Sequence, residues 1–140
     1  KLGSLRMSLN ICKIEKNTMT MSSAAMPPIY HYVAKSKRCD EIGIPGLPLG
    51  GLKNETYDSI TKKVKINDVF ILLSDGLPEA ENKNKELYDY ERVRKVIAKN
   101  GKKSAEEIKD VMLKEVDLWL DGQLPDDDVT IVVIKRNNKK

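Results

Sequence analysis

The stretch that decides the fold is VFILLSDGLPEAEN, at residues 69–82. Its first five residues, Val69 to Leu73, are apolar on both faces, which predicts a strand buried at the centre of a sheet. Ser74-Asp75-Gly76 follows at once, so a carboxylate lies just past the end of that strand. Gly76 allows the backbone to turn sharply beside it. The chain is therefore expected to carry an acidic turn at one rim of a sheet.

A second group of acids precedes another apolar strand. Asp126-Asp127-Asp128 come just before Val129 to Ile134, a β-branched run. If the two strands are antiparallel neighbours, Asp75 and these three acids gather at one rim. Carboxylates so close together stay ionised only beside a cation or basic groups, and a site made of oxygen ligands suits Mg²⁺ or Mn²⁺. By spacing alone, the simpler interpretation is a turn and a solvated loop, and the metal site stays a second interpretation.

The rest of the chain predicts mostly strands, followed by two helices and a final strand. A hairpin is expected through Lys16-Asn17, a turn at Asn67-Asp68, and a shaped loop rich in Gly and Pro at residues 45–51. No strand-helix-strand alternation occurs, which predicts an α+β fold with an antiparallel sheet. The predicted strands are residues 7–15, 18–22, 29–33, 41–44, 57–66, 69–73 and 129–134.

Two helices are expected in the second half. The first has an apolar face beginning at Tyr90, and Asn100-Gly101 predicts a left-handed stop. The second covers residues 104–121 and begins with a capping box formed by Ser104 and Glu107. Its apolar face has helical spacing and is expected to cover a sheet. The residues of that face are Ile108, Val111, Met112, Val116, Trp119 and Leu120.

Length and composition exclude several classes of protein. The 140 residues carry a net charge of +4 and suffice for one domain. Their longest apolar run is Val69 to Leu73, far short of the ~20 residues that cross a bilayer. Cys12 and Cys39 have no metal-site spacing and predict small, partly buried thiols in a reducing cytoplasm. Residues 1–70 have 11 Lys/Arg against 6 Asp/Glu, but the basic residues are scattered without a recognition motif, so nucleic-acid binding is the least favoured function.

Four motifs resemble those of a known family in order and spacing. They are Ser22 to Pro28, Leu47 to Gly50, Leu72 to Asn82, and Asp127 to Val133. The chain resembles the stage II sporulation protein E family from about Met7 to Lys135. These are bacterial PPM-type phosphatases, similar to the eukaryotic protein phosphatase 2C enzymes. The resemblance implies the C-terminal part of a four-layer αββα sandwich with antiparallel sheets.

The resemblance also implies a function and site residues. The family hydrolyses phosphoserine or phosphothreonine on small regulatory proteins of the anti-anti-sigma type, in partner-switching pathways. Two Mn²⁺ or Mg²⁺ ions hold the water that attacks phosphorus. Asp75 and Asp127 match metal-ligand positions of the family, and Asp128 matches a second acid with a weaker claim to ligation. Supporting roles are implied for three further residues, Ser74, Gly76 and Glu79, and for Asn82.

Some parts of the family pattern are absent. Its first metal-binding aspartate and its Asp-x-Ser-Gly-His-Gly motif match nothing in the 140 residues. We therefore expect residues 1–140 to be an N-terminally incomplete domain, inactive alone, with the missing motif and a sensor or regulatory domain upstream. The alternative is a pseudophosphatase that binds a signalling partner without chemistry. Asp89 also stands where the family commonly has glycine.

His31 and Trp119 receive structural interpretations. His31 is the only histidine, lies between two tyrosines in a predicted strand, and has no acid partner visible by spacing. We expect it to be structural. Trp119 is expected to be core packing.

Overall fold

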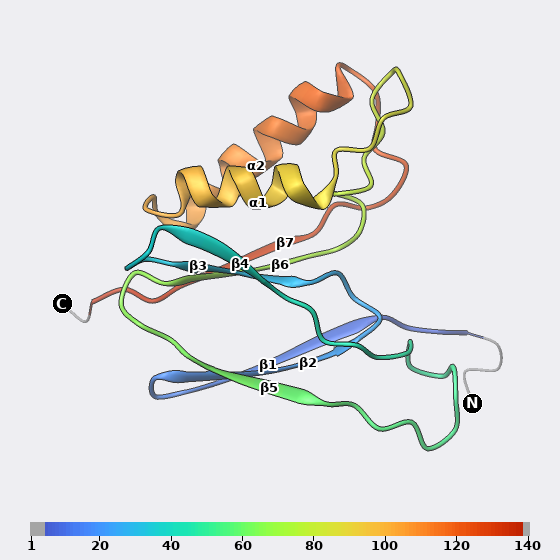
Figure 1. The fold of residues 1–140 in the computed structure, drawn as a ribbon. Coiled ribbons are helices and arrows are strands. Elements are labelled where there is room, and N and C mark those ends of the chain that lie inside the picture. Colours follow the sequence, from blue (N-terminus) through green and yellow to red (C-terminus); the bar gives the residue numbers. More distant parts are fainter. Residues whose placement is uncertain (1–4, 139–140) are drawn as a thin grey trace.

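The computed structural model describes residues 5–138, which fold into two sheets and a pair of helices (Figure 1). All paired strands are antiparallel, and the sheets have the orders β1-β2-β5 and β4-β3-β6-β7. The predicted order of strands and helices is confirmed. In chain order the elements are β1 (Leu9–Glu15), β2 (Thr18–Ala24), β3 (Ile29–Val33), β4 (Arg38–Ile42), β5 (Ser59–Lys63), β6 (Val69–Leu73), α1 (Tyr90–Asn100), α2 (Ala105–Leu120) and β7 (Ile131–Lys135).

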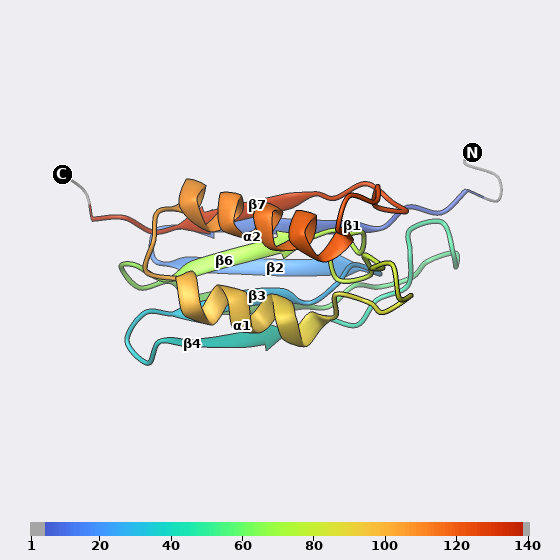
Figure 2. The same ribbon diagram turned by 90° about the horizontal axis from the view of Figure 1, so that it is seen from above.

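The elements stack in three layers. Both helices lie on one face of the four-stranded sheet, and the three-stranded sheet lies against its other face (Figures 1 and 2). Tyr30 and Ile108 belong to the core between helices and sheet, whereas Met21 and Phe70 belong to the core between the sheets. The predicted α+β class with antiparallel sheets is confirmed, and residues 5–138 supply three layers of the αββα sandwich. None of their helices is long and apolar enough to span a bilayer.

Several strand boundaries differ from the prediction. β2 continues to Ala24, and β5 is shorter than the predicted 57–66. β4 begins at Arg38 rather than at residue 41, because main-chain pairing with β3 extends through polar residues that carry no apolar signal. β7 begins at Ile131 rather than at residue 129, because the Thr130 N–H donates to the side chain of Ser74 instead of to a neighbouring main chain.

Helix α2 begins as predicted. The Ser104 hydroxyl accepts the N–H of Glu107 at 3.2 Å, and the Glu107 carboxylate accepts the N–H of Ser104 at 2.8 Å. Helix α1 begins differently: Asp89 has φ 76° and ψ 148°, and its carboxylate accepts the N–H of Tyr90. That conformation favours glycine, which agrees with the glycine that the family resemblance leads us to expect at this position.

The predicted left-handed stop at Gly101 is wrong. Gly101 ends α1 with φ −59° and ψ −13°, a right-handed conformation open to any residue. Glycine is needed there for space, because a Cβ would lie 2.4 Å from ring carbons of the buried Tyr32. Lys135 of β7 then donates its ammonium to the carbonyl oxygens of Gly101 and Lys102, at 3.2 and 3.0 Å. Close contact with the sheet, rather than chain reversal, ends this helix.

Replacing Gly101 with alanine is expected to lower the free energy of unfolding by about 1–3 kcal/mol, because the added methyl overpacks the Tyr32 ring. Gly43 provides a matched control, since a Cβ there meets nothing within 4 Å. Gly43→Ala should stay within about 0.5 kcal/mol of the wild type. Urea unfolding followed by circular dichroism measures both, and equal stabilities of the two variants would contradict this account.

Candidate functional site

The ends of β6 and β7 bring the two acidic motifs together. Leu73 pairs with Ile131, so the antiparallel register places Ser74 beside Thr130. The Ser74 hydroxyl donates to the carbonyl oxygen of Asp128 and accepts the N–H of Thr130, both at 2.9 Å, while the Ser74 N–H donates to the Thr130 carbonyl at 3.1 Å. One serine side chain therefore joins the Ser74-Asp75-Gly76 turn to the segment Asp127-Asp128-Val129-Thr130.

Gly76 lets the same two segments approach closely. A Cβ on Gly76 would lie 2.6 Å from the carbonyl oxygen of Asp128 and 3.1 Å from that of Asp127. Its φ lies outside the left-handed region, so the sharp turn expected from the sequence is not what requires glycine here. The small residue instead allows the backbone of residues 127–128 to rest directly on the end of β6.

Acidic side chains line a cavity at this rim. The cavity has a volume of about 210 Å³, and its lining includes Asp75, Glu79, Asp126 and Asp127. Three of the four acids that the sequence places at one rim thus share a cavity. Asp128 does not line it, and its main-chain carbonyl accepts the Ser74 hydroxyl instead. Within residues 5–138 no three His, Cys, Asp or Glu side chains are grouped closely enough to hold a metal ion.

The site carries concentrated negative charge. Asp127 Oδ1 accepts the N–H of Asp128 at 2.7 Å, which orients that carboxylate. Lys85 forms an ion pair with Glu81 at 3.0 Å, and this bond, together with the charges of Glu81 and Asp126, raises the pKa of the Lys85 ammonium. Burial raises the pKa of the Tyr90 hydroxyl, and the charges of Glu79 and Asp75 raise it further. A cation bound at the rim would reduce the repulsion among the carboxylates that line the cavity.

The loop between β6 and α1 is held by two side chains behind the cavity. The buried Asn82 accepts the N–H groups of Asn84 and Glu86, at 2.9 and 3.0 Å. The indole N–H of Trp119 donates to the carbonyl oxygens of Ala80 and Glu86, at 3.1 and 3.3 Å. Trp119 is half-buried rather than central to the core, and it attaches α2 to the loop that carries Glu79. Helical spacing predicts its burial but gives no sign of these hydrogen bonds.

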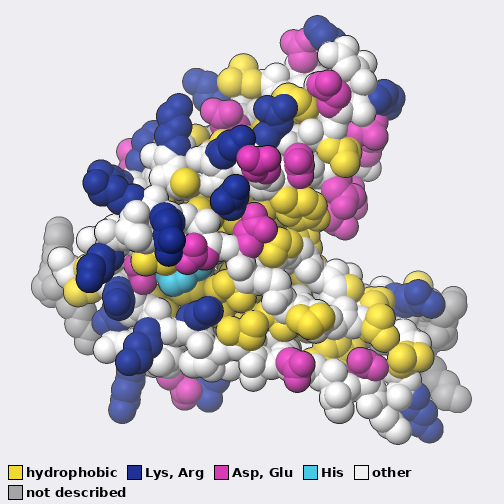
Figure 3. Space-filling model, viewed as in Figure 1, with side chains coloured by type: hydrophobic (Ala, Val, Ile, Leu, Met, Phe, Trp, Pro, Cys, Tyr) yellow, Lys and Arg dark blue, Asp and Glu magenta, His cyan; other side chains and the backbone are white. Residues whose placement is uncertain are grey.

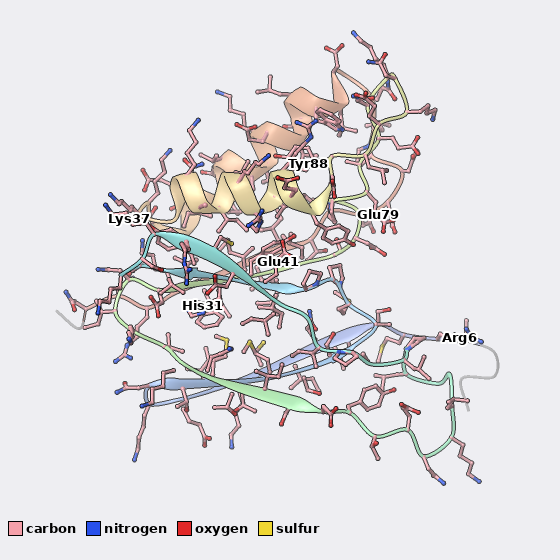
Figure 4. The ribbon with its side chains drawn as sticks, in the orientation of Figure 1. Arg6, His31, Lys37, Glu41, Glu79 and Tyr88 are labelled. Atoms are coloured by element: carbon pink, nitrogen blue, oxygen red, sulfur yellow. The ribbon has the colours of Figure 1, made fainter. Side chains whose placement is uncertain are left out.

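His31 lies outside the site. It is buried between the two sheets, away from Glu79 (Figure 4). Its ring stacks on Phe70 with 4.2 Å between ring centroids, and its Nε2 lies 3.4 Å from a carboxylate oxygen of Asp68. The same carboxylate accepts the N–H groups of Ala34 and Lys65. The expected structural role agrees with this geometry, and the acid partner that spacing did not reveal comes from the predicted turn at Asn67-Asp68.

Removing the Ser74 hydroxyl is expected to weaken the joint between the motifs. Ser74→Ala loses two hydrogen bonds and should lower the free energy of unfolding by about 1–2 kcal/mol, while leaving Asp75 in place. Ser36→Ala is the control, because the Ser36 hydroxyl makes a single exposed 3.5 Å contact with Val33. Hydrogen exchange at the Thr130 amide measures this loss, and it should become faster in Ser74→Ala but not in Ser36→Ala. Unchanged protection would show that the hydroxyl does not hold it.

Comparisons with known proteins agree with this architecture. Phosphoserine phosphatase RsbU of Bacillus subtilis is 28% identical over 127 residues, covering 88% of this chain and 36% of RsbU. Protein IcfG of Synechocystis is 26% identical over 92 residues, 66% of this chain and 14% of IcfG. The chain therefore covers at most 36% of the length of these two curated relatives.

Solved structures share the fold. The phosphatase domain of the cell fate determinant SpoIIE from Bacillus subtilis aligns with a TM-score of 0.74 at 17% identity, covering 95% of this chain and 58% of that one. A structure of RsbU and RsbW domains from Mycobacterium tuberculosis aligns with a TM-score of 0.75 at 19% identity, covering 96% and 37%. The model of the Stage II sporulation protein E (SpoIIE) family matches residues 4–137. With nearly its whole length matched, the chain belongs to the SpoIIE family.

Proposed function

We propose that this chain is the C-terminal part of a phosphatase domain that removes phosphate from a serine or threonine of a regulatory protein. The substrate would be an anti-anti-sigma-type protein of a cytoplasmic partner-switching pathway, and an upstream sensor or regulatory domain would control the reaction. One observation carries the proposal: Asp75 and Asp127, from motifs far apart in the sequence, line the same cavity. The reaction class is inferred from relatives that are named as phosphatases, such as RsbU and the SpoIIE phosphatase domain.

The donors in the cavity suit a hard divalent cation. All of its charged lining side chains are carboxylates, and Mn²⁺ and Mg²⁺ prefer such oxygen ligands. Asp75 and Asp127 would hold the cation, and Asp128 would position its neighbour through the main chain. When bound, divalent ions lower the pKa of water and neutralise phosphoryl charge. The donor set is partial, so we assign the remaining ligands of a two-ion site to a preceding segment.

The residues around Asp75 and Asp127 would hold these two carboxylates in position. Ser74 and Gly76 keep the Asp127 segment against the end of β6, and the Asp128 N–H orients one oxygen of the Asp127 carboxylate. Glu79 lies exposed at the cavity wall, where it adds negative charge next to Asp75. Holding charged groups in position before the reaction is what lets a site stabilise a transition state.

A pseudophosphatase that binds a partner without chemistry is the second candidate. It is favoured by the finding that residues 5–138 contain no group of three side chains able to hold a metal. The two candidates differ in the residues that precede Lys1 in the parent gene. An intact Asp-x-Ser-Gly-His-Gly motif there supports the enzyme, and a substituted one supports the binding module.

Metal dependence tests the proposal directly. The complete gene product should release phosphate from p-nitrophenyl phosphate with Mn²⁺, lose this activity in excess chelator, and regain it when Mn²⁺ is restored. Zn²⁺, which prefers nitrogen and sulfur ligands, should restore less. A complete product that stays inactive with both Mn²⁺ and Mg²⁺, or active in chelator, would contradict the proposed chemistry.

A further inference from the structure

The strand connections of both sheets meet at the end of the molecule opposite the acidic cavity. Val64, between β5 and β6, donates its N–H to the carbonyl oxygen of Asn17, in the β1–β2 turn, at 2.8 Å. Ala34, in the β3–β4 turn, donates its N–H to the carboxylate of Asp68 at 2.9 Å. β6 runs from this end to the cavity, since Asp68 precedes the strand and Asp75 follows it. Hydrogen bonds therefore hold three connections side by side.

The turn between the helices lies at the same end. Val69, the first residue of β6, pairs with Lys135 of β7. The Lys135 ammonium donates to the carbonyl oxygens of Gly101 and Lys102, which belong to the α1–α2 turn. All three layers therefore contribute a turn to one surface. It is broad, because two packed sheets alone are about 10 Å apart.

Exposed lysines gather on this surface, which we call the basic end. It is defined by six exposed lysines of the four connections: Lys16, Lys35, Lys37, Lys65, Lys102 and Lys103. None of the six forms an ion pair with an acid of residues 5–138. Figure 3 shows Lys and Arg gathered toward the left, at this end, and acids toward the upper right. Lys37 and Glu79 lie at the two opposite ends in Figure 4.

Most acids near the basic end are already engaged. Glu15 forms an ion pair with Lys13 at 3.0 Å, and Glu107 accepts a main-chain N–H in the capping box of α2. Asp68 is buried and accepts two main-chain N–H groups. Glu106 is exposed and offsets part of the positive charge. The six lysines therefore remain available to a partner that carries many negative charges.

Two exposed isoleucines lie among these lysines. Ile14, just before the β1–β2 turn, is 56% exposed, and Ile66, next to Lys65, is 46% exposed. Apolar side chains surrounded by basic ones suit the boundary of an anionic bilayer, where the apolar groups enter the headgroup layer and the lysines contact lipid charges. Of the described aromatic residues at this end, Tyr32 is buried, so the surface lacks the exposed rings on which single-stranded nucleic acids stack.

We propose that the basic end docks on an anionic membrane surface, with Ile14 and Ile66 in the headgroup layer. This inference goes beyond the proposed function and does not depend on it. β6 has five residues, so the acidic cavity lies roughly 17 Å farther from the membrane, open to a partner in solution. Anionic lipids repel the acids of the cavity, so both ends of the domain favour the same orientation.

Sedimentation with lipid vesicles tests the proposal on the complete gene product. Vesicles of phosphatidylcholine alone are compared with vesicles in which about a third of the lipid is phosphatidylserine. We expect a partition coefficient about tenfold higher on the phosphatidylserine vesicles at low salt, and a preference below about twofold in 0.5 M salt, which screens exposed charges. Any contribution common to both vesicles cancels in this ratio. Equal partition onto the two vesicles would overturn the inference.

Charge reversal locates the binding surface. The double variant Lys65→Glu, Lys102→Glu should reduce the lipid preference to less than about twofold. The matched variant Lys53→Glu, Lys114→Glu changes the same net charge at exposed lysines outside the basic end and should keep the preference. Circular dichroism checks that both variants are folded. An unchanged preference in the first variant, or an equal loss in the second, would overturn the assignment to the basic end.

Replacement of the isoleucines separates a membrane from other polyanions. Ile14→Ser, Ile66→Ser should lower partition onto phosphatidylserine vesicles about fivefold, because less apolar surface enters the lipid. The control Leu52→Ser, Leu124→Ser removes exposed apolar side chains elsewhere and should leave partition unchanged. Duplex DNA and polyglutamate serve as soluble polyanions. If either binds as tightly as the vesicles, and the isoleucine variant binds vesicles like wild type, the basic end recognises charge alone and the membrane proposal is wrong.

Discussion

Replacing Asp75 with alanine in the complete gene product is expected to reduce Mn²⁺-dependent phosphate release from p-nitrophenyl phosphate at least about a hundredfold, a loss of roughly 2.7 kcal/mol in transition-state stabilisation. Asp75 follows β6 directly and lines the acidic cavity with Asp127. An alanine removes the carboxylate that we propose as a ligand and puts no oxygen in its place. The fold should survive, because the Asp75 side chain is exposed and its main-chain carbonyl still accepts the N–H of Glu79.

Asp126 provides the matched control for this prediction. It is an exposed acid of the same cavity, but it stands outside the family motif. Asp126→Ala should keep activity within about threefold of wild type, because an exposed charge that is not a proposed ligand is screened by solvent and salt. Asp127→Ala should behave like Asp75→Ala. If Asp75→Ala retains wild-type activity, or Asp126→Ala loses as much, the assignment of ligands at this rim is wrong.

Replacing Trp119 with alanine should cost about 3 kcal/mol of stability, near the low end for truncating a large aromatic residue because Trp119 is only half-buried. The indole ring meets Tyr88 edge-on at 5.8 Å between centroids, and the Arg92 guanidinium lies 4.3 Å from its centroid. Its N–H also binds the carbonyl oxygens of Ala80 and Glu86. The variant therefore frees the 75–89 loop from α2, and we expect aggregation or a large fall in the urea midpoint.

Two neighbouring substitutions separate the causes of this loss. Leu118 precedes Trp119 on α2 but is 67% exposed, so Leu118→Ala should change stability by less than about 0.5 kcal/mol. Trp119→Phe keeps an aromatic ring and loses the donor, and it should cost about 1–2 kcal/mol. Circular dichroism must follow unfolding, because Trp119 is the only tryptophan. A Trp119→Ala protein with unchanged thermal unfolding would contradict the packing of α2 described above.

Local patterns predicted most of the secondary structure. The apolar run of β6 places it between two other strands, and the Ser104–Glu107 capping box starts α2, because both signals depend on residues close together in the chain. The polar strand β4 was largely missed, since an edge strand is stabilised by main-chain pairing with β3 and needs no apolar pattern. The sequence predicts a left-handed turn at Gly101 and misses the need for space, because the neighbouring ring of Tyr32 lies far away in the sequence.

The candidate site could likewise be predicted from the sequence only in part. Sequence motifs identified Asp75 and Asp127 as candidate ligands and made antiparallel pairing of their strands the condition for them to meet. That condition is fulfilled by the β6–β7 register, and Ser74 and Gly76 then join the two segments. The structure also shows that Asp75, Asp126 and Asp127 line one cavity and that Asp128 does not, a distinction that no spacing rule contains.

By itself, the sequence determined the order of the strands and helices, the family resemblance and the acids that can carry the chemistry, because periodicity, caps and motifs are written in neighbouring residues. Only the tertiary structure decided which acids share a cavity, why Gly76 and Gly101 must be small, and which buried acid approaches His31. These features arise from contacts between residues distant in the chain, and such contacts exist only once the sheets and helices have packed.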